Sequence, residues 1–295
     1  KNGCGKTSSL AKISRALIDT HSRLATVVNK PDLNQVVVFI HTSSVRDFTP
    51  SSKEGAARAR VFTFNPGTPR KANSESMAVL LVDVARGHDN NGPLLTHFSE
   101  ILKDEFPDFE MRVPVRIEQD GPRPKVDYVP FDIWSSGNEQ EVLENSGKVF
   151  TSYPLEFFDS DGARRKLSLG QSSFLRFVLT ALSNAGPASV LVIDEPENFL
   201  HPNLISRFMR TLNRILEGTR SIAIIATHSP FVVREVQSAH VHVMDVEDGE
   251  SVIKKPLVQT LGASISTISN EVFGDDLPSH LYDELLDRAE FHSHS

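Results

Sequence analysis

A short apolar run that ends in two acidic residues constrains the fold of this chain more than any other segment. Residues 190–193 read Val-Leu-Val-Ile without polar alternation, and Asp194 and Glu195 follow directly. Such a run is typical of a strand that is buried on both faces of a parallel sheet. Similar runs at residues 36–40 (VVVFI) and 221–226 (SIAIIA) predict two more buried strands. The pattern therefore indicates an α/β fold with a largely parallel sheet.

Segments whose apolar residues have helical spacing lie between these runs. After the opening glycines, Leu10, Ile13 and Leu17 recur three and four positions apart, which predicts a helix at the start of the chain. Because helices between parallel strands cover the sheet, the order strand, helix, strand supports the same fold class. Further helices are predicted over residues 76–84, 170–184 and 202–216, and further strands over residues 60–64 and 241–244.

The middle of the chain has a different character. Residues 86–147 contain several prolines, Asp/Asn-Gly turn signals and the single tryptophan, without a long periodic segment. We therefore predict an irregular insertion, or peripheral lobe, over residues 86–163. The sheet domain is then split between residues 1–85 and 164–250, and residues 251–295 form a C-terminal extension.

Gly5, Lys6 and Thr7 stand where a loop turns into the first predicted helix. They match the second half of the phosphate-binding pattern G-x-x-x-x-G-K-[ST], whose first glycine would precede Lys1. In that pattern backbone N–H groups ring a phosphate, the lysine reaches the β- and γ-phosphates, and the threonine ligates Mg²⁺. A glycine-rich turn before an ordinary helix explains the same residues. The predicted nucleotide contacts of this segment are Asn2, Gly3, Cys4, Gly5, Lys6, Thr7 and Ser8.

The two acids after the central run are candidates for metal and water chemistry. A carboxylate at the C-terminal end of a parallel strand points into the crevice where α/β proteins bind ligands. We expect Asp194 to hold Mg²⁺ and Glu195 to polarise an attacking water. A strand followed by a charged turn is the plainer alternative, but Pro196 directly after the acids makes the signal more specific.

Two further segments are ambiguous alone. Ser168, Gly170 and Gln171 precede a predicted helix, so a hydroxyl, a glycine and a helix N-terminus form a potential anion site. An ordinary helix capped by Ser168 or Ser172 is equally consistent. His228 follows a predicted strand at the level of the two acids, where it can reach a terminal phosphate, although a lone histidine after a strand is usually structural.

Together these elements resemble the ABC ATPase family in order and spacing. Residues 1–7 are similar to Walker A, residues 167–171 (LSLGQ) to the signature L-S-x-G-Q, and residues 190–195 to Walker B with its catalytic glutamate. Residues 198–202 (NFLHP) resemble the D-loop region, and His228 resembles the switch histidine. Leu169 departs from the glycine usual in transporters, and the Q-loop glutamine has no clear counterpart.

The residues around the Walker B motif and the switch histidine are similar to those of RecF/OLD-like members of this family. DEPENFLHPNL followed by IIATHSPFVV most resembles ATPase subunits of bacterial antiphage systems (PtuA of Septu and of certain retrons, and OLD-type proteins). This resemblance covers residues 1–84 and about 164–275. It implies ATP and Mg²⁺ as ligands, Thr7 and Asp194 as metal ligands, and Glu195 and His228 as catalytic residues.

The resemblance also implies partners. Ser168, Gly170 and Gln171 would complete the nucleotide site of a second copy in a head-to-tail homodimer. An effector nuclease subunit, or DNA or RNA, is a further expected partner.

Three functions remain open at this stage. They are an ATPase that controls an effector nuclease in a defence complex, a RecF- or SMC-like DNA-repair ATPase, and a transporter cassette. The net charge of −7 gives no global electrostatic footprint for nucleic acid. No apolar run approaches the length needed to cross a membrane. The single cysteine, Cys4, fits a reducing cytosol, so we expect a cytoplasmic protein without a membrane partner.

Overall fold

The computed structural model describes residues 5–18, 33–40, 48, 59–63, 76–87, 94–117, 125–200, 202–248 and 250–274. The chain divides into two compact units. One spans Lys6–Thr227, and the other combines Lys1–Gly5 with His228–Ser295. The larger unit contains the predicted parallel sheet.

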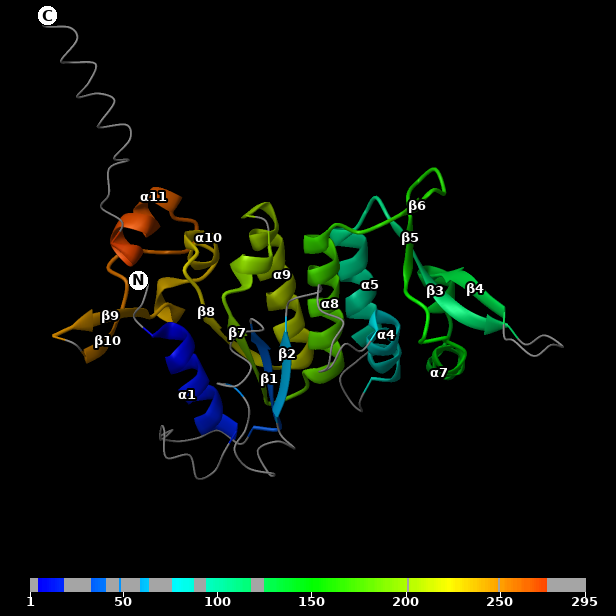
Figure 1. Cartoon of the computed structure of the whole chain (residues 1–295), viewed down its shortest axis with the longest axis horizontal. Helices are drawn as coiled ribbons and strands as arrows, with labels where there is room; N and C mark the ends of the chain where they lie inside the picture. Colours follow the sequence, from blue (N-terminus) through cyan, green and yellow to red (C-terminus); the bar gives the residue numbers. More distant parts are fainter. Residues whose placement is uncertain are drawn as a thin grey trace, which may run out of the picture. The chain divides into compact units, whose positions relative to one another are not determined.

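Four parallel strands form this sheet, in the order β2-β1-β7-β8 (Figure 1). Phe39 pairs with Ile193 and Asp194 pairs with Ala226, so the carboxyl ends of β1, β7 and β8 share one edge. The predicted runs at residues 36–40, 60–64, 190–193 and 221–226 are all confirmed as strands. The bounds are β1 Gln35–Ile40, β2 Ala59–Thr63, β7 Ser189–Asp194 and β8 Ile222–Ala226.

Alternate residues of the central strands pack on opposite sides of the sheet. Val36, Val38 and Val192 share a buried cluster with Leu10 and other residues of helix α1 (Lys6–Ile18). On the other face, the Phe39 ring lies 4.8 Å from that of Phe177 in helix α8 (Leu169–Asn184). Burial on both sides is the physical reason for the non-alternating sequence pattern.

One buried-strand prediction is wrong. Only Ala226 of β8 is buried, and Ile222 is 58% exposed. Within the described sheet β8 is a terminal strand with β7 as its one neighbour, so water reaches the side chains that the apolar run had placed in the core.

Further helices pack with α8 beside the sheet (Figure 1). The Phe177 and Phe208 rings, 4.7 Å apart, join α8 to α9. Helix α4 begins after Ser76, whose hydroxyl caps it, so the predicted helix at residues 76–84 is confirmed. The bounds of these helices are α4 Met77–Arg86, α5 Leu94–Glu105 and α9 Pro202–Thr219.

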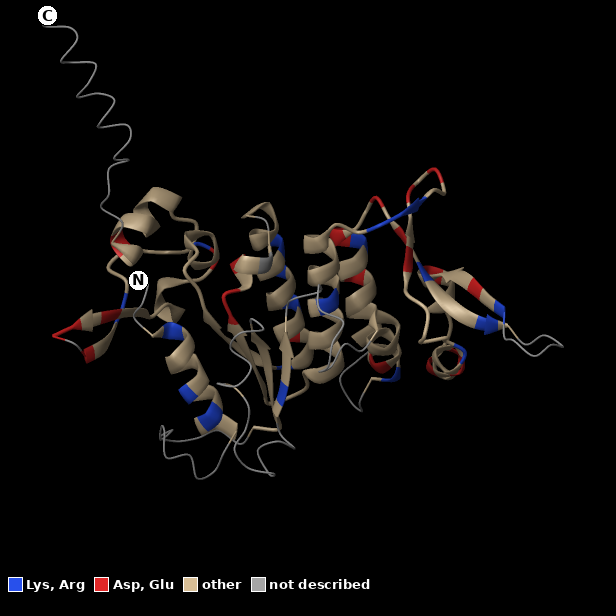
Figure 2. Cartoon of the chain, in the orientation of Figure 1, with Lys and Arg blue, Asp and Glu red and all other residues tan. Residues whose placement is uncertain are grey.

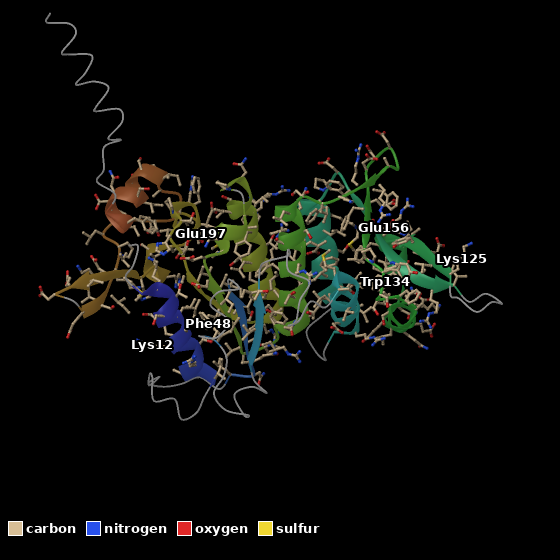
Figure 3. The ribbon with its side chains drawn as sticks, in the orientation of Figure 1. Lys12, Phe48, Lys125, Trp134, Glu156 and Glu197 are labelled. Atoms are coloured by element: carbon tan, nitrogen blue, oxygen red, sulfur yellow. The ribbon has the colours of Figure 1, made fainter. Side chains whose placement is uncertain are left out.

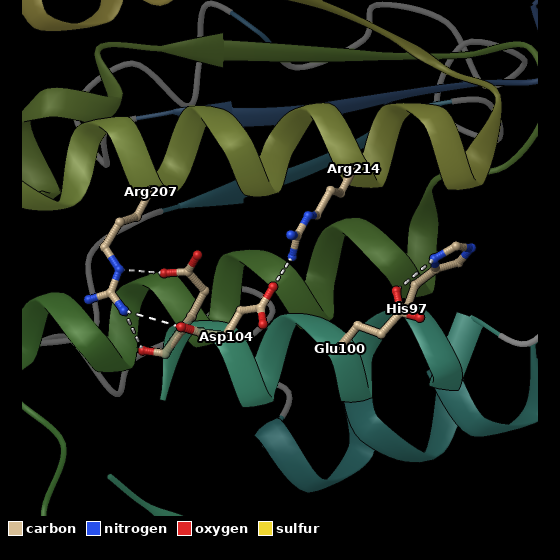
Figure 4. A network of polar contacts seen from close by, with 6 residues as sticks. His97, Glu100, Asp104, Arg207 and Arg214 are labelled. Atoms are coloured by element: carbon tan, nitrogen blue, oxygen red, sulfur yellow. Dashed lines mark hydrogen bonds and ion pairs between the residues drawn. The ribbon is translucent and has the colours of Figure 1, made fainter. Parts of the chain in front are cut away.

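Polar contacts hold α5 against α9 (Figure 4). Arg207 pairs with Glu105 at 2.6 Å and donates to the backbone carbonyl of Glu105 at 3.1 Å. Arg214 pairs with Asp104 at 2.5 Å. At the other end of α5, His97 packs on Gly218, where a β-carbon would lie 3.0 Å from the imidazole ring. The absence of a side chain at Gly218 thus lets the two helices approach closely.

The expectation of an irregular insertion is wrong: α5 packs beside α8 and α9, and the described part of residues 110–165 forms an ordered antiparallel lobe. Its four strands run in the order β4-β3-β5-β6. Trp134, labelled in Figure 3, is buried, and its indole N–H donates to the Asn145 carbonyl at 3.3 Å. The amide of Asn145 returns a bond to the Trp134 carbonyl at 3.1 Å. The elements are β3 Glu110–Ile117, β4 Lys125–Pro130, α6 Phe131–Trp134, α7 Glu139–Gly147, β5 Glu156–Phe158 and β6 Arg164–Arg165.

The smaller unit has its own small core of Val233, Ile268 and Val272. Its two strands, β9 and β10, pair antiparallel, and β9 overlaps the strand predicted at residues 241–244. Among the described residues, every helix is too short or too polar to span a lipid bilayer. The elements of this unit are α10 Pro230–Val233, η3 Ser238–His240, β9 Val243–Glu247, β10 Glu250–Lys254, α11 Ile265–Ile268 and η4 Ser269–Phe273.

Candidate nucleotide site

The first turn of α1 meets the C-terminal end of β7. The Thr7 hydroxyl donates a hydrogen bond to Oδ1 of Asp194 at 3.1 Å, across 187 residues of sequence. Asp194 is only 2% exposed, so its carboxylate is held almost out of water. Two motifs predicted separately from the sequence therefore lie side by side at the carboxyl edge of the parallel sheet.

The start of α1 suits an anion. Gly5 has a φ of +77°, a conformation that favours glycine, and it lets the chain turn into the helix that begins at Lys6. The first turn of α1 has no acidic residue. The positive end of the helix dipole therefore faces no acid from the turn itself. Lys6 and Ser8 both belong to this turn, and their contacts with a phosphate stay predictions.

The remaining residues of the predicted loop, Asn2, Gly3 and Cys4, lie outside the described residues. Their contacts with a phosphate stay predictions.

Glu195 adopts a left-handed backbone conformation directly after the strand, with φ 48° and ψ 59°. This conformation costs a non-glycine residue about 1–2 kcal/mol. Its N–H donates to the Ala226 carbonyl at 2.8 Å, which ties the turn to the end of β8. Its carboxylate accepts a hydrogen bond from the Asn198 amide at 2.7 Å. The turn leads into η2 (Pro196–Phe199), with Pro196 as its first residue.

Glu197 provides a second link to β8. Its Oε1 accepts a hydrogen bond from the Thr227 hydroxyl at 2.8 Å, and Figure 3 labels Glu197. The sequence pattern predicts no role in the site for Glu197, for Thr227 or for Asn198 by itself. The polar residues that follow Asp194 and Glu195 in the sequence are the signal from which Glu197 and Asn198 could have been predicted.

The residues of the predicted signature lie at the start of α8. Ser168 caps this helix: its hydroxyl accepts from the Gln171 N–H at 3.2 Å, and its own N–H donates to the Gln171 side chain at 2.9 Å. Ser168 is thus confirmed as the cap, in place of Ser172. Gly170 lies in the first turn, and Leu169 is 69% exposed.

Topology places this helix start at the same edge of the sheet as Asp194. The link between α8 and β7 is four residues long. A 16-residue helix is about 24 Å long and a six-residue strand about 20 Å. Because the chain reverses direction between them, the start of α8 lies near the level of the end of β7. Nucleotide contacts at Ser168, Gly170 and Gln171 stay predictions.

His228 is the first residue of the smaller unit and directly follows Thr227. Its predicted contact with a terminal phosphate stays a prediction.

The described residues fit a magnesium–nucleotide complex. A hydroxyl and a carboxylate are oxygen ligands of the kind that Mg²⁺ accepts, and Mg²⁺ is usually held by one or two protein groups together with phosphates and water. Within the described ranges, no group of three or more His, Cys, Asp and Glu side chains could hold a metal by itself. A metal shared with a bound phosphate therefore agrees with the small donor set of Thr7 and Asp194.

Charges on the antiparallel lobe are mixed. Figure 2 shows Lys and Arg interspersed with Asp and Glu over its described part. Arg112 pairs with Glu110 at 2.6 Å, and Arg164 pairs with Glu156 at 2.9 Å. These pairs partly neutralise the arginines of this surface.

Comparison with known proteins covers the part of the chain that contains Asp194 and Glu195. Residues 114–234 match the family described as "AAA domain, putative AbiEii toxin, Type IV TA system". The chain is also 34% identical over 125 residues to Protein ea59 of Escherichia phage lambda, across 42% of this chain. The match spans about a quarter of that relative, 24% of its length. Over the matched residues the chain is thus similar to an AAA domain, and the parallel sheet flanked by helices agrees with the predicted α/β fold class.

Proposed function

We propose that this chain is an ATP-hydrolysing head of the ABC type that works as a nucleotide-switched, head-to-tail homodimer. In this proposal it controls or recruits an effector nuclease in a bacterial antiphage defence complex. The hydrogen bond between Thr7 and Asp194, 3.1 Å long, is the observation that supports ATP chemistry most directly. It joins the hydroxyl and the carboxylate that a magnesium–nucleotide site requires.

The residues of the site divide the chemistry among them. Lys6 and the first turn of α1 bind the phosphates, and Thr7 and Asp194 hold Mg²⁺, which neutralises phosphate charge when bound. Glu195 orients a water molecule and accepts its proton. The water oxygen forms a bond to the γ-phosphorus, the bond to the β–γ bridging oxygen breaks, and ADP leaves with that electron pair. The proton passes from Glu195 to phosphate or solvent.

The start of α8 supports the homodimer. Ser168 and Leu169 are exposed there, at the sheet edge where the nucleotide would lie. In a head-to-tail pair this surface of one copy would complete the site of the other, and the two-fold axis would use the same patch twice.

The family description supports the effector role. Its words "putative AbiEii toxin, Type IV TA system" belong to that family, and they favour an ATPase that is coupled to a toxic effector. The mixed charge of the lobe favours a protein partner over a long stretch of DNA or RNA, which calls for clustered Lys and Arg.

The test of the proposed function is the Glu195→Gln variant. We expect it to bind ATP, to hydrolyse ATP at least a hundredfold more slowly, and to remain dimeric in ATP by light scattering. Glu217→Gln, on the exposed surface of α9, is the matched control and should behave as the unchanged protein. Unchanged turnover in Glu195→Gln would contradict the role of Glu195 as the base.

The partner is tested separately. A nuclease subunit that co-purifies with the protein would support the defence role. Salt-sensitive DNA binding with DNA-stimulated hydrolysis would instead support the RecF- or SMC-like alternative.

A further inference from the structure

We propose that Asn198 is a positioning residue for Glu195, because its side-chain amide holds the Glu195 carboxylate in the orientation that hydrolysis uses. This inference rests on the proposed function and adds a residue to its site.

The contact is short and local. Nδ2 of Asn198 donates to Oε2 of Glu195 at 2.7 Å, and the backbone N–H of Asn198 donates to the Glu195 carbonyl at 3.1 Å. Two bonds thus join the same two residues, one from the backbone and one from the side chain. A hydrogen bond to an ionised carboxylate is shorter and stronger than a bond between neutral groups.

An ordinary structural role explains the contact poorly. Glu195 stands at the N-cap position of η2, but its side chain makes no capping bond to that helix. The carboxylate instead accepts from the Asn198 side chain. Asn198 is exposed and Glu195 is half-buried, so the bond satisfies no fully buried group. The bond therefore restricts the rotamers of Glu195 more than it stabilises η2.

The segment under Asn198 is well anchored. Glu197 accepts from Thr227 at 2.8 Å, the Glu195 N–H donates to Ala226 at 2.8 Å, and Pro196 and Leu200 are buried. A side chain can orient a neighbour precisely only when its own backbone is fixed. Glu195 has a strained, left-handed backbone conformation. Such conformations are common at functional sites, where surrounding contacts hold the residue in place.

The experiment measures ATP hydrolysis and ATP affinity in two Asn198 variants. Asn198→Ala removes the donor, and Asn198→Asp keeps the shape but places a second carboxylate at the contact. We expect kcat to fall roughly ten- to a hundredfold in Asn198→Ala and further in Asn198→Asp. ATP affinity, measured with a fluorescent nucleotide, and the thermal midpoint should stay within about twofold and about 2 °C of the unchanged protein.

Asn213 offers a matched control. On the exposed face of α9 its amide donates to the Glu217 carboxylate at 2.8 Å, the same chemical pair away from η2. Asn213→Ala and Asn213→Asp should leave kcat unchanged.

A double-mutant cycle separates positioning from structural damage. If Asn198 acts through Glu195, Asn198→Ala should not slow the residual hydrolysis of Glu195→Gln further. An equal further loss in that background, lost ATP affinity, or an unchanged kcat in both Asn198 variants would overturn the inference. If the unchanged protein hydrolyses no ATP, the proposed function fails as well; if only the Asn198 variants fail to respond, the proposed function stands.

Discussion

Removing Arg207 should destabilise the larger unit far more than removing Arg214, although both arginines reach from α9 to the end of α5. The two arginines are almost equally exposed, at 39% and 40% of their side chains. Their acidic partners differ: the Glu105 side chain is 4% exposed and the Asp104 side chain 53%. The burial of the carboxylate is therefore the main difference between the two ion pairs, and Arg207 also donates to backbone carbonyls at the end of α5.

The expected magnitudes follow from that difference. Truncating one partner of a buried ion pair costs about 3–5 kcal/mol, because the other charge stays buried alone. Since Arg207 is partly exposed, water can enter after its removal, and we expect ~2–3 kcal/mol for Arg207→Ala. Its bond to the Glu105 carbonyl at the C-terminal end of α5 is included in that loss. An exposed pair contributes about 0.2–1 kcal/mol, so Arg214→Ala should cost below about 1 kcal/mol.

Thermal unfolding followed by circular dichroism measures both variants. For a unit of this size about 1 kcal/mol corresponds to roughly 2–4 °C, so the midpoint should fall by about 4–12 °C in Arg207→Ala and by less than about 4 °C in Arg214→Ala. In a Glu105→Gln background the effect of Arg207→Ala should shrink, because no buried charge is left behind. Equal shifts for the two arginines would refute the argument from burial.

Three other outcomes are expected. Phe177→Ala removes a buried ring between Phe39 and α9, so chemical denaturation should show a loss of about 3–5 kcal/mol in the free energy of unfolding. A loss below about 1 kcal/mol would contradict the importance of the two ring contacts. The hydrogen bond from Arg165 lowers the pKa of the Asp159 carboxyl below its ordinary 3.8, so the contact stabilises the fold above pH 3.8 and this stabilisation is lost as the pH falls below 3.8. An NMR titration should show that the pKa of Asp159 rises in Arg165→Ala. Ser168→Arg should leave ATP binding by a single copy intact and abolish hydrolysis, and equal loss of both would make this residue purely structural.

The parallel sheet and its main helices could be predicted from the sequence because each depends on a contiguous pattern. The run at residues 190–193 is buried on both faces, and α1, α8 and α9 follow from spacing within single segments. Thr7 and Asp194 could be predicted as partners because the carboxyl ends of parallel strands share one edge with the helix starts.

The antiparallel lobe and α5 could not be predicted because sequence signals for strands, helices and turns conflict in this region. Pro114 lies inside β3, a strand with partners on both sides, where proline normally argues against a strand. It is tolerated because pairing with β5 ends at Arg112, and the Pro114 carbonyl accepts from the Phe150 N–H instead. In α5, Leu94, Phe98 and Ile101 do have helical spacing, but turn signals before the helix obscured it.

Two polar bonds of the candidate site could not be predicted. The bonds of Asn198 and Thr227 depend on the left-handed turn at Glu195, which no local propensity specifies.

Magnesium-dependent ATP binding tests the central claim most directly. The affinity of the protein for a fluorescent ATP analogue is measured with Mg²⁺ and with EDTA, in the unchanged protein, Thr7→Val and Asp194→Asn. If Thr7 and Asp194 form one magnesium–nucleotide site, Mg²⁺ should strengthen binding at least tenfold in the unchanged protein, and both variants should lose most of that gain. A gain from Mg²⁺ that is equally large in all three proteins would contradict the assignment.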